Sequence, residues 1–326
     1  MTLTNEGIPI EVHLRAEEWA GLLREDAAAG LTASPKELSP TWLYDDRGCD
    51  LFEQITRLPE YYPTRTERSI LADRAGEIAD ISGADTLIEL GAGSSEKTRL
   101  LLDAMANGGR LRRFQLFDVA EPTLRATAEA VASEYPALEV SGVVGDFRRH
   151  LDRIATGGRR MIAFLGGTIG NFDPAERAAL LGELSATMAP GDTFLLGTDL
   201  VKDRARLVAA YDDAAGVTAA FNKNVLAVLN RELGADFDLD GFDHVARFDD
   251  DHEWIEMRLR SRGRQKVWVE GLDVALDFEP GEDIRTEISA KFRPAGVQAE
   301  LAAAELDPVA WWTDPEGDYG VSLSVR

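Results

Sequence analysis

Cysteine and histidine are scarce in this sequence of 326 residues, and their scarcity limits the possible chemistry. Cys49 is the single cysteine, which excludes an internal disulfide and any metal site built from several cysteines. The four histidines show neither a His-x-x-x-His nor a His-Glu-x-x-His spacing. We therefore expect a protein without a metal centre.

Positive charge and long hydrophobic runs are also lacking. The 35 Lys and Arg residues face 58 Asp and Glu residues, and a formal net charge of -23 repels a polyanion such as nucleic acid. No run reaches the roughly 18 apolar residues that a membrane helix needs. The first 20 residues include Glu11, Glu17 and Glu18, unlike a signal peptide. We expect a cytoplasmic protein that acts on a small molecule, with neither nucleic acid nor a membrane as partner.

The segment between Asp85 and Asp199 alternates short apolar runs with Ala-rich helical stretches, which is typical of parallel strands joined by crossover helices. The helical stretches include Pro122–Tyr135 and Pro174–Met188. This pattern predicts a doubly wound α/β core. Its five expected strands are residues 86–90, 113–117, 139–144, 160–165 and 192–196.

After Asp199 the pattern changes. A helical stretch, Val201–Leu229, precedes three segments of alternating polarity, Trp254–Arg260, Lys266–Glu270 and Asp283–Phe292. Alternation of this kind predicts an antiparallel sheet with one polar and one apolar face. A helix at 294–304 and a last strand at 319–325 complete the expected chain.

A glycine-rich loop, Glu89-Leu-Gly-Ala-Gly-Ser-Ser95, follows the first predicted strand and leads into a helix. In that position glycines let the backbone approach a cofactor closely, although a turn without a ligand can have the same sequence. Glu96 occupies the third glycine position of the dinucleotide fingerprint Gly-x-Gly-x-x-Gly. A nicotinamide-dependent oxidoreductase is therefore disfavoured.

Two acidic residues end later strands, at the carboxyl edge where such sheets bind ligands. Asp118 can accept hydrogen bonds from both hydroxyls of a ribose, or it can cap the following helix. Asp146 and Phe147 stand where methyltransferases commonly place an acid on the adenine amino group and an apolar side chain on the adenine face. The turn Ala189-Pro-Gly-Asp192 before the fifth strand resembles one found in many methyltransferases. The order of these features predicts a methyltransferase fold.

Longer motifs carry a more specific resemblance. Leu58-Pro-Glu-Tyr-Tyr-Pro-Thr-Arg-Thr-Glu67, Phe164-Leu-Gly-Gly-Thr-Ile-Gly-Asn171 and Gly197-Thr-Asp-Leu-Val-Lys202 are similar to the histidine Nα-methyltransferase family of ergothioneine biosynthesis, over about residues 31–326. The resemblance implies S-adenosylmethionine as cofactor, L-histidine as substrate and hercynine, the α-N-trimethylated product, after three transfers. Further shared motifs are Ala210-Tyr-Asp-Asp213, Phe221-Asn222 and Asn230-Arg-Glu232.

The same resemblance implies a class I, Rossmann-like fold with a seven-stranded sheet, whose last hairpin is antiparallel, and an inserted α+β substrate domain. We expect the cofactor-binding domain to comprise residues 66–199 and 292–326. The histidine-recognition domain would comprise residues 1–65 and 200–291. A monomer is expected.

The resemblance also assigns roles to individual residues, and catalysis would depend on placement of the amine. An α-amine attacks only when neutral, and because the cofactor methyl is already activated, a strong protein base is optional. The residues expected near the amine and its growing methyl groups are Tyr44, Gly166 and Thr168. Those expected to bind the rest of the substrate are Tyr61, Asn171, Tyr211, Met257, Glu287 and Ser289. Those expected to bind the cofactor are Gly91, Lys97, Asp118, Asp146 and Phe147.

Several of these residues have plainer interpretations from the residues alone. Tyr61 and Met257 could belong to the core, and Lys97 could be an ordinary surface lysine. Glu287 alternates with apolar neighbours and shares a strand face with Arg285, so it could face solvent. Two other functions also stay open: methylation of another amino acid or amine, and binding of S-adenosylmethionine without catalysis.

Overall fold

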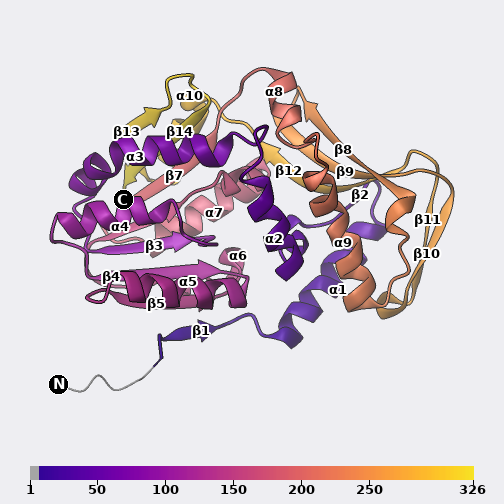
Figure 1. Ribbon diagram of the computed structural model, residues 1–326, viewed down its shortest axis with the longest axis horizontal. Helices are drawn as coiled ribbons and strands as arrows, with labels where there is room; N and C mark the ends of the chain where they lie inside the picture. Colours follow the sequence, from indigo (N-terminus) through magenta and orange to yellow (C-terminus); the bar gives the residue numbers. More distant parts are fainter. Residues whose placement is uncertain (1–6) are drawn as a thin grey trace.

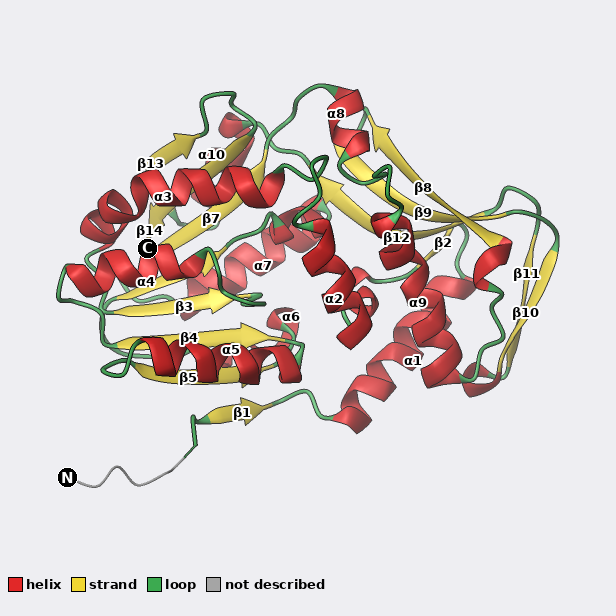
Figure 2. Cartoon of the chain, viewed as in Figure 1, coloured by secondary structure: helices red, strands yellow, loops and turns green. Residues whose placement is uncertain are grey.

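A mixed eight-stranded sheet forms one half of the molecule in the computed structural model, which describes residues 7–326 (Figures 1 and 2). Neighbouring strands are parallel from β1 to β7, and β14 and β13 are antiparallel. In spatial order the strands are β1 (Ile10–Val12), β5 (Glu139–Val144), β4 (Arg113–Asp118), β3 (Thr86–Leu90), β6 (Arg160–Phe164), β7 (Thr193–Asp199), β14 (Tyr319–Val325) and β13 (Asp307–Thr313).

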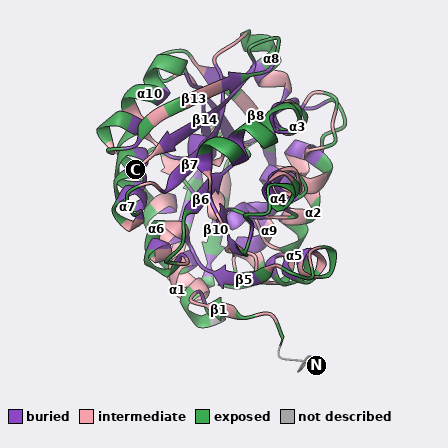
Figure 3. Cartoon of the chain, turned by 90° about the vertical axis from the view of Figure 1, so that its left-hand side faces the viewer, coloured by how far each residue is buried: buried purple, intermediate pink, exposed green. Residues whose placement is uncertain are grey.

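The doubly wound core predicted from the sequence is confirmed, with helices on both faces of the sheet. Leu87 and Ile88, neighbours on β3, enter different hydrophobic clusters because successive strand side chains point to opposite faces. Figure 3 shows the buried strands between these layers. One face is covered by α3 (Pro63–Ser82), α4 (Thr98–Asn107) and α5 (Glu121–Glu134), the other by α7 (Pro174–Thr187) and α10 (Pro294–Ala303).

The expected count of seven strands is wrong by one, because β1 pairs in parallel with β5. Gly142 on β5 has no side chain, and a Cβ there would lie 3.3 Å from Ile10 Cγ1 and 2.6 Å from Leu124 Cδ2. The added strand covers a sheet edge that would otherwise present unpaired backbone groups. Ile10–Val12 therefore belongs to the large sheet, although residues 1–65 were expected in the histidine-recognition domain. Residues 1–6 of that segment lie outside the described residues.

A second sheet, with a separate hairpin beyond it, forms the other half (Figure 2). The predicted segment Lys266–Glu270 lies in that hairpin rather than in the sheet. The sheet consists, in order, of β2 (Lys36–Glu37), β12 (Asp283–Ala290), β9 (Trp254–Ser261) and β8 (Phe242–Asp249), and the hairpin of β10 (Gln265–Val269) and β11 (Val274–Phe278).

Helices from both the N-terminal region and the middle of the chain pack on this second sheet in one hydrophobic cluster. The expected helical stretch Val201–Leu229 is divided in two, because Asp213 accepts the N–H groups of Val217 and Thr218 and Gly216 has a positive φ of 75°. A new helix therefore starts after Gly216. The helices are α1 (Ala16–Thr32), α2 (Asp46–Ile55), α8 (Arg204–Ala209) and α9 (Val217–Leu233).

The two halves meet where a short 3-10 helix, η3 (Thr168–Asn171), packs on β12. Gly170 allows this approach, since a Cβ there would lie 2.9 Å from the carbonyl oxygen of Ala290. The residues after β6 are thereby held against the second sheet. No helix of the described part of the chain is long and apolar enough to cross a membrane.

Candidate active site

A cavity of about 820 Å³ opens between the carboxyl ends of the parallel strands and the second sheet. Cavities of this size typically hold small-molecule ligands. Every site residue named from the sequence lines this cavity, so residues far apart in the chain are brought together. They are Tyr44, Tyr61, Gly91, Lys97, Asp118, Asp146, Phe147, Gly166, Thr168, Asn171, Tyr211, Met257, Glu287 and Ser289.

The glycine loop presents bare backbone to the cavity. Gly91 and Gly93 have positive φ angles of 69° and 49°, and a Cβ on either would meet nothing within 4 Å. Open space at a glycine turn is what a closely approaching cofactor requires. Asp118 accepts the N–H groups of Gly93 and Ala120, each at 2.9 Å, so its carboxylate is tied to the loop. Burial raises the pKa of Asp118, while these backbone bonds oppose the rise.

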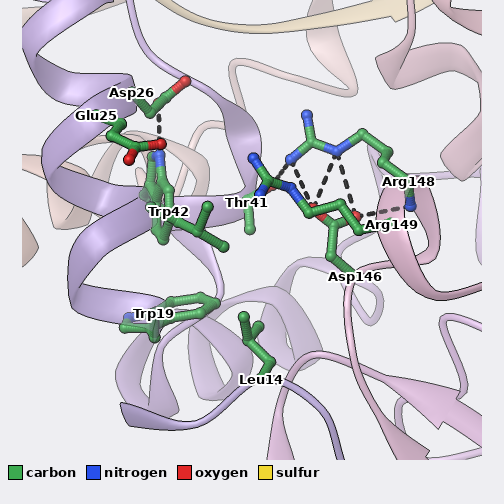
Figure 4. A pocket seen from close by; sticks show the side chains of 10 residues that line it. Leu14, Trp19, Glu25, Asp26, Thr41, Trp42, Asp146, Arg148 and Arg149 are labelled. Carbon is green, nitrogen blue, oxygen red and sulfur yellow. Dashed lines mark hydrogen bonds and ion pairs between the residues drawn. The ribbon is translucent and has the colours of Figure 1, made fainter. Parts of the chain in front are cut away.

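Asp146 caps a short helix after β5, α6 (Phe147–His150), and Phe147 is the first residue of that helix. The Asp146 carboxylate accepts the backbone N–H of Arg148 at 2.9 Å and pairs with its guanidinium at 3.1 Å. That guanidinium also donates to Thr41 Oγ1, at the edge of a smaller cavity of about 210 Å³ that Trp19 helps to line (Figure 4). Asp146, which is expected to bind the adenine amino group, therefore lies beside Arg148, whose side chain contacts the N-terminal segment.

Lys97 forms a short ion pair with Glu67, which belongs to the motif Leu58–Glu67 but was not predicted as a site residue. The Glu67 side chain has no solvent exposure. Its carboxylate also accepts the N–H of Gly166 and the hydroxyl of Tyr319. The predicted cofactor lysine and a predicted amine-site glycine are thus joined by one buried carboxylate.

Elsewhere on the cavity wall, the hydroxyl groups of Tyr211 and Ser289 lie 2.7 Å apart. Lys291 donates to both of them and pairs with Asp199. Lys291 was not predicted as a site residue, because a lysine in a segment of alternating polarity is usually exposed. Asp199 also accepts the hydroxyl of Tyr62 at 2.8 Å, which holds this network to the large sheet.

Glu287 is 7% exposed and lines the cavity, which decides between the two sequence interpretations of its strand face. Within residues 7–326 no group donates a hydrogen bond to its carboxylate. Burial raises the pKa of Glu287 to about 8, and the nearby Lys291 ammonium limits the rise. Its cross-strand neighbour on β9 is Met257. The side chain is therefore free to pair with a ligand.

Aromatic side chains close the wall next to Glu287. Tyr44 packs edge-on against Phe221 with ring centroids 5.4 Å apart, and Tyr61 packs edge-on against Tyr211 at 6.2 Å. Burial raises the pKa of both Tyr44 and Tyr61, so their phenol groups stay protonated. This part of the cavity is apolar except for a few fixed hydroxyl and carboxyl groups.

Comparison with known proteins gives matches over nearly the whole chain. The family model described as "Histidine-specific methyltransferase, SAM-dependent" matches residues 23–326. The chain is 60% identical over 314 residues to histidine N-alpha-methyltransferase from Mycolicibacterium smegmatis, covering 96% of this chain and 98% of the relative. It is 56% identical over 319 residues to the protein of the same name from Mycobacterium tuberculosis, covering 98% and 99%.

More distant matches include ergothioneine biosynthesis protein 1 from Neurospora crassa, 32% identical over 325 residues, which covers 98% of this chain and 36% of that relative. Among solved structures, the mitomycin 7-O-methyltransferase MmcR is similar with a TM-score of 0.48 and 16% identity, over 96% of this chain and 69% of that chain.

Proposed function

Because the chain belongs to the family of S-adenosylmethionine-dependent, histidine-specific methyltransferases, we propose that it methylates the α-amino group of L-histidine. Three successive transfers give hercynine, the precursor of ergothioneine. The mycobacterial relatives that are 56–60% identical over nearly their whole length support this substrate. The proposed compartment is the cytoplasm and the proposed state is a monomer.

One observation supports the proposal above the others: a single cavity contains both the glycine loop with Asp118 and the buried carboxyl group of Glu287. The first fits a nucleoside with a ribose diol, and the second fits a side chain that offers a polar N–H. A methyl donor and an imidazole could therefore occupy one enclosed space.

The residues that would hold S-adenosylmethionine are Gly91, Lys97, Asp118, Asp146 and Phe147. When bound, this cofactor supplies a sulfonium methyl group that needs no further activation. Lys97 lies on the same side of the cavity as Gly166, since both contact Glu67. The cofactor's amino acid end and the substrate amine are thus proposed to meet at this point.

The protein's own contribution is placement of a neutral amine, at the distance of about 3–3.5 Å that in-line attack requires. Tyr44, Gly166 and Thr168 would surround the amine, and Gly166 leaves room for added methyl groups. A Cβ at Gly166 would lie 3.6 Å from Lys97 Nζ and 3.8 Å from Thr168 Oγ1, so a larger residue would fill this space.

The remaining substrate contacts follow the cavity wall away from Gly166. Asn171 and Tyr211 are proposed to hold the carboxylate, and Tyr61 and Met257 to pack on the imidazole. Glu287 and Ser289 would pair with the ring nitrogens. These two residues lie on β12, two positions apart, and therefore project from the same face of the strand.

Mass spectrometry of a reaction with L-histidine and S-adenosylmethionine tests the proposal. We expect a product with three added methyl groups, all on the α-nitrogen. Methylation of an imidazole nitrogen would overturn the assignment. Transfer to another amino acid in a panel, but not to histidine, would identify the alternative substrate class. Formation of no S-adenosylhomocysteine with any amine would indicate a binding protein without catalysis.

A further inference from the structure

A buried ammonium group lies directly behind the proposed substrate contacts. Lys291 follows β12, and its side chain has no solvent exposure. Because it does not reach the cavity wall, Lys291 can act on a ligand only through the residues in front of it. Those residues are Tyr211 and Ser289, both of which line the cavity.

All three N–H donors of the Lys291 ammonium group have acceptors in the protein. A lysine ammonium has three N–H donors and no acceptor. Its three partners are Ser289 Oγ at 2.8 Å, Tyr211 Oη at 2.9 Å and an Asp199 carboxylate oxygen at 3.0 Å. Each hydroxyl oxygen therefore accepts one hydrogen bond from Lys291, and the ammonium has no donor left for a ligand.

The Tyr211–Ser289 pair keeps one hydroxyl proton for a ligand. Tyr211 and Ser289 have two hydroxyl protons between them, and their 2.7 Å contact uses one. Neither can point at the ammonium, which only donates. One hydroxyl proton is left to point into the cavity.

The charge of Lys291 is balanced from behind. Burial alone would raise the pKa of Asp199, but the ammonium groups of Lys291 and Lys202 hold this pKa below its ordinary value. Tyr62 and Lys202 also bond the Asp199 carboxylate. Removal of Lys291 would therefore leave Asp199 with other partners, and the fold around it need not collapse.

We propose that Lys291 is a positioning residue that determines specificity: it makes the Tyr211–Ser289 pair donate one hydrogen bond, and only one, to the substrate. This inference rests on the proposed function. Since Tyr211 is proposed to hold the substrate carboxylate, Ser289 donates to Tyr211 and the remaining Tyr211 proton goes to that carboxylate, which leaves the Ser289 oxygen able to accept one hydrogen bond from the imidazole. An apolar side chain would leave the Ser289 oxygen and the Glu287 carboxyl group unpaired, which is costly in a buried site.

The test compares Lys291→Met, which removes the donors, with Lys291→Gln, whose amide keeps two N–H donors without the charge. Calorimetry with S-adenosylhomocysteine present measures histidine affinity. We expect Lys291→Met to weaken histidine binding by about tenfold or more, with partial recovery in Lys291→Gln. The KM for histidine should rise more than kcat falls, and affinity for S-adenosylhomocysteine alone should stay within about twofold.

A double-mutant cycle with Ser289→Ala identifies the route of the effect. If Lys291 acts through the hydroxyl pair, Lys291→Met should cost much less histidine affinity in the Ser289→Ala background. Equal losses in both backgrounds, or parallel losses of histidine and cofactor affinity, would overturn the inference. If the wild-type protein itself neither binds nor methylates histidine, the proposed function fails instead.

Discussion

The two carboxylate oxygens of Glu67 accept the backbone N–H of Gly166 at 2.9 and 3.0 Å. The two residues are 99 positions apart in the chain, on α3 and in the loop after β6. This contact fixes the turn in which Gly166 has a φ of 80°. It also places the partner of Lys97 directly behind the proposed amine site.

Glu67→Gln should lower the free energy of unfolding by about 1–3 kcal/mol, because the buried pair with Lys97 is broken while the side-chain shape is kept. The remaining amide oxygen can still accept from Gly166 and Tyr319, but the amide N–H₂ would face an ammonium. Urea denaturation measures the change. In a Lys97→Met background the same substitution should cost clearly less, and an equal cost would show that the pair does not couple.

Gly197→Ala should destabilise the protein by about 1–3 kcal/mol or more, because overpacking forces buried neighbours to move. A Cβ at Gly197 would lie 2.0 Å from Glu67 Oε1 and 2.9 Å from the Tyr319 hydroxyl. Displacement of Glu67 should also reduce methyl transfer.

The matched control is Gly182→Ala on α7, where a Cβ would meet nothing within 4 Å. That variant should keep or gain stability, by up to about 1 kcal/mol, because alanine favours a helix over glycine. Thermal unfolding of both variants checks the pair. Similar losses in both would mean that Gly197 is not kept for close packing.

The central sheet was predictable from the sequence because its strands are short apolar runs separated by helices. The segment 139–144 matches β5 at both ends. Ile10–Val12 gave no such signal, since three residues are too few to show alternation. The division of Val201–Leu229 was also missed, although Asp213 and Gly216 supply capping and turn chemistry there.

The resemblance to the family, rather than any local sequence pattern, predicted which residues gather in one cavity. Glu287 illustrates the limit: alternation placed it on the face of Arg285, a partly exposed residue, and only the packing of β12 against the cavity shows that Glu287 is buried. Glu67 and Lys291 were missed because burial of a charged residue depends on a partner distant in sequence.

Asp118→Ala should weaken S-adenosylmethionine binding by about 1.5–3 kcal/mol, because charge-assisted bonds to the ribose hydroxyls would be lost. The bonds from Gly93 and Ala120 orient this carboxylate toward the cavity before any ligand arrives. Calorimetry measures the affinity. The control Glu121→Ala removes a nearby carboxylate that pairs with Arg125, and it should leave binding unchanged. Unaltered affinity in Asp118→Ala would refute the proposed ribose contact.

Glu287→Ala should weaken histidine binding by at least about tenfold, or 1.4 kcal/mol, because the proposed partner of an imidazole nitrogen is removed. Cofactor affinity should hardly change, and phenylalanine should be essentially inert with the wild-type protein. Glu279→Ala, which removes an exposed carboxylate paired with Arg264, is the control. Wild-type affinity in Glu287→Ala would place imidazole recognition elsewhere.

Glu287→Gln should change the pH dependence of stability in the absence of ligands. The folded-state pKa of Glu287 is about 8, above the ordinary value of 4.5. Below about pH 4.5 the group is protonated in both the folded and unfolded states, so the wild-type protein bears no charge-burial penalty from it. As pH rises toward about 8, the unfolded state loses this proton first, and the wild-type protein loses stability.

The glutamine side chain cannot ionise. The free energy of unfolding of the variant, relative to that of the wild-type protein, should therefore rise by a few kcal/mol between about pH 5 and pH 8.5. Urea unfolding at both pH values measures the difference. Glu89, whose pKa burial raises to about 7, contributes a similar slope to both proteins and cancels in the comparison. Parallel stability profiles would mean that Glu287 is already ionised near neutral pH in the folded protein. The imidazole would then bind an ionised Glu287 carboxylate rather than a protonated carboxyl group.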